Sequence, residues 1–175
     1  IDYITIATTG NATDFGNLTW PPRSELAACA DATRGVFGGG YGTGYSNVLD
    51  YITISTTGNA TDFGDLTVGR TDAAACADAT RGVFGGGGEG ASRYNTLDYI
   101  TIATTGNATD FGDLTVARIA PGACADATRG VFGGGQYSGG SSNTLDYITI
   151  STTGNATDFG NLTEARYGLA ACAGA

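Results

Sequence analysis

The sequence contains no histidine and no lysine, so it lacks many of the side chains on which catalysis and anion binding depend. Its eight cationic residues are all arginine and stand against 17 acidic residues, which gives a formal net charge of −9. We expect no nucleic-acid partner, because neutralising phosphates requires a basic surface. With the usual bases and nucleophiles reduced to carboxylates and tyrosine, we expect no enzymatic activity, no cofactor and no metal site.

Long apolar runs and an initiator methionine are also missing. A membrane helix needs roughly 18 to 20 apolar residues, so we expect no membrane insertion. The chain begins in the middle of a pattern, which is typical of a piece of a longer protein. Four cysteines occur at 29, 76, 124 and 172, each inside an Ala-Cys-Ala run. This regularity predicts one small, buried, free thiol per repeat rather than a disulfide framework.

A 15-residue motif, DYITI-A/S-TTGNATDFG, dominates what is present. It begins at Asp2, Asp50, Asp98 and Asp146, with a constant spacing of 48 residues. A fixed period of this size indicates a repeat architecture. We therefore expect a single repeat domain over 1–175, with units of approximately 1–48, 49–96, 97–144 and an incomplete 145–175.

Each period contains four strand signals and no helical periodicity. DYITI is apolar on both of its alternating faces, and the Gly58-Asn59 pair after it predicts a two-residue hairpin turn in which Asn59 serves the turn geometry. NATDFGDLT then forms the return strand. An Ala-rich strand such as LAACAD and a short strand RGVFGGG complete the set. The fold class is therefore all-β.

Four strands in 48 residues match one blade of a β-propeller, with Ala-Ala-Cys-Ala as the innermost strand, where only small side chains fit. The glycine doublet after Val36-Phe37, the fourth-strand aromatic Phe63 and the following Arg70 resemble the kelch repeat, although kelch units usually carry Trp where this chain has Phe. The resemblance implies a kelch-like propeller of about four blades of four antiparallel strands, or a segment of a larger one. Counting a last strand over 169–173, the chain is one strand short of closure.

Near-identical units with RGVFGGG and DYITI-x-TTGNATDFG also resemble repeat proteins of bacteriophage virions, in tail fibres or other surface components. That resemblance implies a virion-surface or extracellular location. It also implies partners among host-surface glycans or proteins, other virion proteins, or copies of the chain itself.

The copies differ mainly in two families of loops, which strand polarity places on one face. They are 41–48, 88–96 and 136–144 between the second and third strands, and 20–26, 68–73, 116–122 and 164–169 between units. Tyrosine among Gly and Ser is typical of adaptable binding surfaces. We therefore expect this variable face to bind a glycan or protein, with candidate residues Trp20, Tyr41, Tyr45, Glu89, Arg93, Tyr94, Tyr137 and Tyr167.

Two alternatives remain open for the function. The repeats can be a purely structural module of virion assembly, or a carboxylate-pair glycosidase that uses residues of the variable face, namely Glu25, Asp72, Glu89 or Glu164. The recurrent aspartates, Asp50 and its equivalents among them, fit no calcium loop. We expect them to pair with the arginines that also recur once per unit, Arg34, Arg81 and Arg129.

Overall fold

The small-residue and β-branched segments of each repeat form strands in the computed structural model, which describes residues 1–19 and 22–173. The described chain is all-β and forms three four-stranded antiparallel sheets. The first sheet contains β3 (Ala27–Ala30), β4 (Arg34–Gly38), β5 (Val48–Thr53) and β6 (Thr61–Asp65). The second contains β7 (Ala74–Ala77), β8 (Arg81–Gly85), β11 (Thr96–Thr101) and β12 (Thr109–Asp113). The third contains β13 (Gly122–Ala125), β14 (Arg129–Gly133), β17 (Thr144–Thr149) and β18 (Thr157–Asn161).

Three short hairpins accompany these sheets. An N-terminal hairpin pairs β1 (Asp2–Tyr3) with β2 (Thr13–Asp14). Within the variable loops, β9 (Gly88–Glu89) pairs with β10 (Ser92–Arg93), and β15 (Gln136–Tyr137) pairs with β16 (Gly140–Ser141). The sequence did not predict the last two hairpins, because their residues have weak strand propensity. Among the described residues, no helix is long and apolar enough to cross a membrane.

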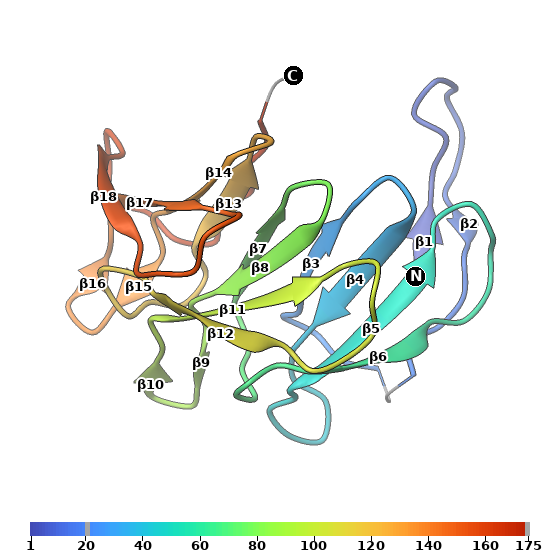
Figure 1. Ribbon diagram of the computed structural model, residues 1–175, viewed down its shortest axis with the longest axis horizontal. Coiled ribbons are helices and arrows are strands. Elements are labelled where there is room, and N and C mark those ends of the chain that lie inside the picture. Colours follow the sequence, from blue (N-terminus) through green and yellow to red (C-terminus); the bar gives the residue numbers. More distant parts are fainter. Residues whose placement is uncertain (20–21, 174–175) are drawn as a thin grey trace.

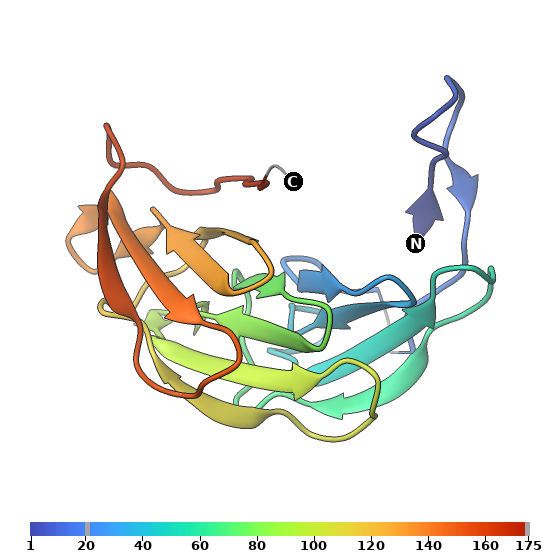
Figure 2. The ribbon, with the colours of Figure 1, turned by 45° about the horizontal axis from the view of Figure 1, so that its top comes forward.

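The sheets follow one another in an open arc (Figures 1 and 2), with the N-terminal hairpin at one end and the C-terminal segment at the other. Residues 1–19 and 22–173 form no closed ring. The predicted strand over 169–173 is also absent from the structure. In each complete sheet the Ala-rich strand pairs with the RGVFG strand that follows it, whereas residues 169–173 have no such strand partner among the described residues.

The Ala-rich strands β3, β7 and β13 are the ones at which neighbouring sheets meet, as the sequence predicts. The thiol of Cys29 lies against Gly82 and that of Cys76 against Gly130, where a Cβ atom would collide with the sulfur. Burial raises the pKa of the Cys76 thiol to about 12, so this side chain behaves as a small apolar group. All four cysteines are free. The predicted burial is confirmed for Cys29 and Cys76, but it is wrong for Cys124, which is half-buried, and for Cys172, which is exposed.

Apolar side chains from facing sheets fill the space between them. We call the side of a sheet that carries the phenylalanine of its fourth strand (Phe63 in the first sheet) its Phe face. The opposite side, which carries the isoleucines of the DYITI segment, is its Ile face. The first interface packs the Phe face of the first sheet (Val36, Leu49, Phe63, Leu66) against the Ile face of the second (Phe84, Ile100, Ile102). The second interface repeats it with Val83, Leu97, Phe111 and Leu114 against Phe132, Ile148 and Ile150. The DYITI strand therefore contributes to the core on both faces, as its pattern predicts.

The Gly-Asn pair does not form the predicted two-residue turn. The chain turns earlier, where the Thr56 N–H donates to the Thr53 carbonyl at 3.1 Å. Gly58-Asn59 instead reaches the preceding hairpin: the Gly58 N–H donates to the Phe15 carbonyl at 2.8 Å, and the Asn59 side chain accepts from the Asn17 N–H at 2.9 Å. The same bonds recur at both interfaces between sheets. TTGNAT is therefore repeated because it joins neighbouring units.

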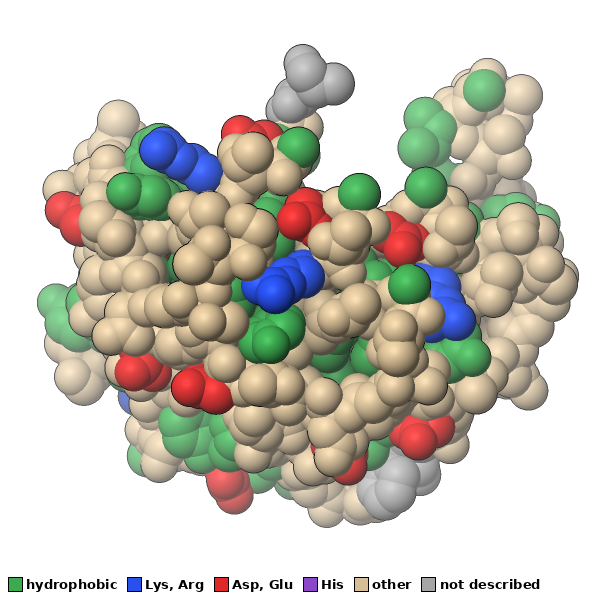
Figure 3. Space-filling model, in the orientation of Figure 1, with side chains coloured by type: hydrophobic (Ala, Val, Ile, Leu, Met, Phe, Trp, Pro, Cys, Tyr) green, Lys and Arg blue, Asp and Glu red, His purple; other side chains and the backbone are tan. Residues whose placement is uncertain are grey.

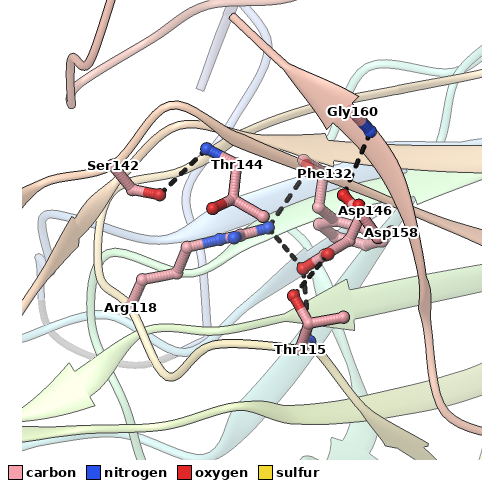
Figure 4. A network of polar contacts seen from close by, with 8 residues as sticks. All are labelled: Thr115, Arg118, Phe132, Ser142, Thr144, Asp146, Asp158 and Gly160. Carbon is pink, nitrogen blue, oxygen red and sulfur yellow. Dashed lines mark hydrogen bonds and ion pairs between the residues drawn. The ribbon is translucent and has the colours of Figure 1, made fainter.

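The recurrent aspartates pair with arginines other than those predicted. Asp98 on β11 binds Arg70 of the segment between sheets at 2.7 Å, and both side chains are fully buried. Equivalent pairs join Arg23 to Asp50 at 2.7 Å and Arg118 to Asp146 at 2.8 Å. Figure 4 shows Thr115 completing the third site by donating to the other carboxylate oxygen of Asp146 at 2.6 Å. Each pair holds a connecting segment onto the third strand of the next sheet.

Arg34, Arg81 and Arg129 stack on aromatic rings instead of pairing with these aspartates. The guanidinium carbon of each lies 4.7 Å from a ring centroid, over Tyr51, Tyr99 and Tyr147 respectively. Register explains the difference, because β4 places Arg34 opposite Thr53, at the far end of β5 from Asp50. These arginines cover the tyrosine side of the DYITI strand.

Candidate functional site

The two families of variable loops lie together, as strand polarity predicts. Isolated antiparallel bridges join the segment before each sheet to the loop after its second strand, at Ser24 with Tyr41, Thr71 with Gly88, and Ile119 with Gln136. Residues that differ between the repeats are therefore concentrated on one face. On the side of the molecule drawn in Figure 3, arginine side chains are few and separated, so that side carries no basic patch.

A chain of backbone hydrogen bonds runs across this face from unit to unit. The Asp72 N–H donates to the Glu25 carbonyl at 2.9 Å, and the Ala120 N–H donates to the Asp72 carbonyl at 2.8 Å. Glu25, Asp72 and Ala120 have φ values of 59°, 53° and 50°. Non-glycine residues rarely adopt this left-handed conformation, which costs roughly 1–2 kcal/mol. The arrangement brings the acidic residues Glu25 and Asp72 of successive units next to each other.

A depression of about 320 Å³ opens beside these two carboxylates. Its lining comes from three successive units: Glu25, Tyr41, Tyr45, Thr71, Asp72, Gly88, Gly90 and Ile119. The volume lies at the lower end of the range for small-molecule sites and suits a ligand of about one sugar ring. Because it is built from loops of different units, no single repeat contains the site.

Tyr41 and Tyr45 form the aromatic part of the depression. Their ring centroids lie 5.1 Å apart with an interplanar angle of 69°, an edge-to-face contact. The two residues are 46% and 39% exposed, so part of each ring is free to contact a ligand. The Tyr41 backbone is held in place by reciprocal hydrogen bonds with Ser24, at 2.9 and 3.0 Å. The pair is therefore an exposed aromatic surface on a fixed backbone.

The carboxylates give the depression a negative potential. Partial burial, and then the charge of Glu25, raise the pKa of Asp72 above its usual range. Carboxylate oxygens accept hydrogen bonds from hydroxyl and ammonium donors. The site can therefore bind a ligand with several such donors and disfavours an anionic one. No group of three or more metal-ligating side chains occurs among the described residues.

The other described site candidates are not among the lining residues of this depression, although Glu89 stands between the lining residues Gly88 and Gly90. The Tyr94 hydroxyl donates to Glu89 at 3.3 Å. Arg93 donates to the backbone and side-chain oxygens of Gln136 at 3.2 and 3.1 Å, which joins the loops of two units. Tyr137 and Tyr167 are exposed. Trp20 lies outside the described residues.

The sequence identified Tyr41 and Tyr45 as binding candidates, but it linked Glu25 and Asp72 only to catalysis and missed Thr71 and Ile119. Glu25 and Asp72 occupy equivalent loop positions, and glycine at the last equivalent, Gly168 with φ 69°, was the available signal of a left-handed conformation. No family model and no curated protein matches the chain. Its function must therefore be argued from the site itself.

Proposed function

We propose that the three sheets are consecutive blades of a kelch-like β-propeller, or of a segment of one, and that the variable face binds an uncharged or amino-bearing glycan without catalysis. Three features support the blade arrangement: each sheet has four antiparallel strands, the small-residue strands of successive sheets meet, and the sheets stack face to face. A host-surface glycan bound by a virion-surface or extracellular protein is the setting that the sequence resemblance favours.

The observation that carries the glycan proposal is the Tyr41–Tyr45 pair beside two carboxylates. The apolar face of a sugar ring packs on an aromatic side chain, and its hydroxyl groups donate to fixed acceptors. The depression offers both, because its lining includes the partly exposed Tyr41 and Tyr45 together with Glu25, Asp72 and Thr71. Its size matches one sugar ring.

Charge narrows the ligand class. The chain has a net charge of −9, and the carboxylates of Glu25 and Asp72 lie at the site itself. A sialylated, sulfated or phosphorylated glycan would be repelled, because like charges at this range disfavour association. Neutral hexoses and amino sugars have the donors and lack the negative charge.

A glycan-binding screen followed by calorimetric titration tests the proposal. We expect binding to neutral or amino-bearing glycans, and at least about a tenfold loss of affinity in Tyr41→Ala and in Tyr45→Ala, because exposed aromatic anchors often dominate such sites. Tyr167→Ala is the matched control, because Tyr167 is an exposed variable-face tyrosine that does not line the depression. Absence of binding to any uncharged glycan would contradict the proposal and favour the structural-module alternative.

The raised pKa of Asp72 next to Glu25 favours a second candidate, the carboxylate-pair glycosidase. Such enzymes use one protonated and one ionised carboxyl group, which neighbouring acidic residues can provide. Release of reducing sugar from a bound glycan, abolished in both Glu25→Gln and Asp72→Asn, would support this candidate. Binding without turnover would support the non-catalytic proposal.

A further inference from the structure

The two ends of the arc carry the two halves of the interface that joins its units. At the end of the third sheet, the Phe face is uncovered: Phe159 is 53% exposed, whereas its equivalents Phe63 and Phe111 are each 2% exposed. At the N-terminal hairpin, Ile4 and Ile6 are 63% and 94% exposed. Their equivalents in the second and third sheets are buried in the cores between sheets: Ile100, Ile102, Ile148 and Ile150.

The backbone groups of the same interface are also free to pair. Inside the arc, the Gly106 N–H donates to the Phe63 carbonyl at 2.7 Å and the Asn107 side chain accepts from the Asp65 N–H at 3.1 Å. By repeat equivalence, Gly10 and Asn11 of the N-terminal hairpin correspond to this donor and acceptor, and Phe159 and Asn161 to their partners. A Cβ atom at Gly64 would collide with the Gly106 carbonyl, whereas nothing lies within 4 Å of a Cβ at Gly160.

The charges at the two ends are complementary as well. Asp2 is the equivalent of Asp50, Asp98 and Asp146, each of which is buried against an arginine, and in the structure it is exposed. Arg166 is the equivalent of Arg70, and here its guanidinium group pairs with the exposed Glu164, at 3.3 Å. Thr163 corresponds to Thr67, which donates to the carboxylate of Asp98 at 2.5 Å. One end therefore has the acidic half of the buried pair and the other has the basic half.

We propose that the exposed Phe face of the third sheet binds the N-terminal hairpin of a second copy of this chain, so that copies associate head to tail. The contact reproduces the part of the interface between sheets that the third and fourth strands make. Ile4 covers Phe159, and Asp2 pairs with Arg166. Gly10 and Asn11 bind the backbone of β18. Within one molecule these surfaces lie at opposite ends of the open arc (Figure 2), so a second copy can bring them together without rearranging the sheets. This proposal is independent of glycan binding, which uses a different face.

Analytical ultracentrifugation of the 175-residue chain, from about 10 µM to about 1 mM, tests the proposal over the range expected of a weak interface. We expect the mass to rise with concentration. In Phe159→Arg or Ile4→Arg alone, one of the two binding surfaces is blocked, so we expect a monomer at every concentration. Both side chains are exposed, so circular dichroism should show an unchanged fold.

Mixing the two variants gives the sharpest result. Phe159→Arg retains an intact hairpin and Ile4→Arg retains an intact Phe face, so the mixture should form a dimer of one copy of each and nothing larger. Tyr137→Arg, which changes an exposed residue of β15 outside the proposed contact, is the control and should associate as the unmodified chain does. A chain that stays monomeric at every concentration, as closure within one molecule would require, would overturn the proposal. Association that persists in both arginine variants would overturn it as well.

Discussion

Arg70 and Asp98 form an ion pair from which water is excluded, since both side chains are fully buried. Burial lowers the pKa of Arg70, while the charge of Asp98 acts to raise it. Around the pair, Thr67 donates to the carboxylate and the guanidinium donates to the carbonyls of Thr96 and Phe84. The contribution of such a pair to stability depends on both partners, because removal of one leaves an unpaired charge in a site without solvent.

Arg70→Ala is therefore expected to lower the free energy of unfolding by about 3–5 kcal/mol, the usual cost of breaking a buried ion pair. Urea denaturation followed by far-UV circular dichroism measures this free energy. Arg166→Ala, measured at a protein concentration at which copies do not associate, is the control, because Arg166 pairs with Glu164 at the surface, where both side chains are exposed. We expect less than about 1 kcal/mol there. Similar losses in the two variants would contradict the role assigned to the buried pair.

Asp72 should destabilise the fold when it is ionised. Burial and Glu25 raise its folded pKa above the unfolded value, so its contribution to stability is present below the unfolded pKa and is lost as the pH rises through the folded pKa. Asp72→Asn removes this loss, and asparagine tolerates the left-handed conformation. We expect Asp72→Asn to be more stable than the unmodified chain at pH 7, by less than about 1 kcal/mol at this partly exposed site.

Urea midpoints of Asp72→Asn and of the unmodified chain, compared at neutral pH and near pH 3, check the sign of this stability difference. The difference between Asp72→Asn and the unmodified chain should shrink at the lower pH, where Asp72 is protonated in both the folded and the unfolded chain. A variant that is less stable at pH 7 would show that the carboxylate makes a favourable contact that outweighs the repulsion from Glu25.

At the scale of elements, strands were more predictable than turns. In the three sheets the Ala-rich, RGVFG, DYITI and TDFG segments form the expected strands, because their propensities and alternation agree with the final structure. The predicted last Ala-rich strand over 169–173 is wrong, since these residues form no strand. Gly58-Asn59 has the local signature of a turn, but its N–H and side-chain oxygen bind the preceding unit instead. A single sequence contains no information on such bonds between units, so the local signal led to the wrong element.

The glycine of TDFG allows this close approach between neighbouring elements. Gly64 and Gly160 have similar φ values, 142° and 135°, but only at Gly64 would a Cβ collide with the next unit. Substitution by alanine costs backbone strain at both positions, so the difference between Gly64→Ala and Gly160→Ala isolates the collision. We expect Gly64→Ala to be less stable by an additional 1–3 kcal/mol, roughly the cost of overpacking a tight contact. Thermal unfolding at low protein concentration, where copies do not associate, measures it, and equal losses would contradict a close-packed interface.

At the scale of the whole molecule, the residues that recur in every unit join the sheets into the arc, and the variable loops form the candidate site. The period, the all-β class, the meeting of Ala-rich strands and the shared face of the variable loops could all be predicted from residues. The choice of Arg70 over Arg81 as the partner of Asp98 could not, because it depends on register and on the path of the segment between sheets. The depression at Tyr41 and Tyr45 was also beyond prediction, since three units contribute to it.

We propose that the repeated motif holds the units together and that the depression on the variable face binds a glycan. An amide NMR titration of the chain with an uncharged glycan that it binds tests this most directly. We predict that the shifts concentrate at 41–45, 71–72 and 88–90, around the depression, and leave the TTGNAT segments unchanged. Shifts centred on 56–61 and the equivalent TTGNAT segments, with none at Tyr41 or Tyr45, would contradict glycan binding at the depression.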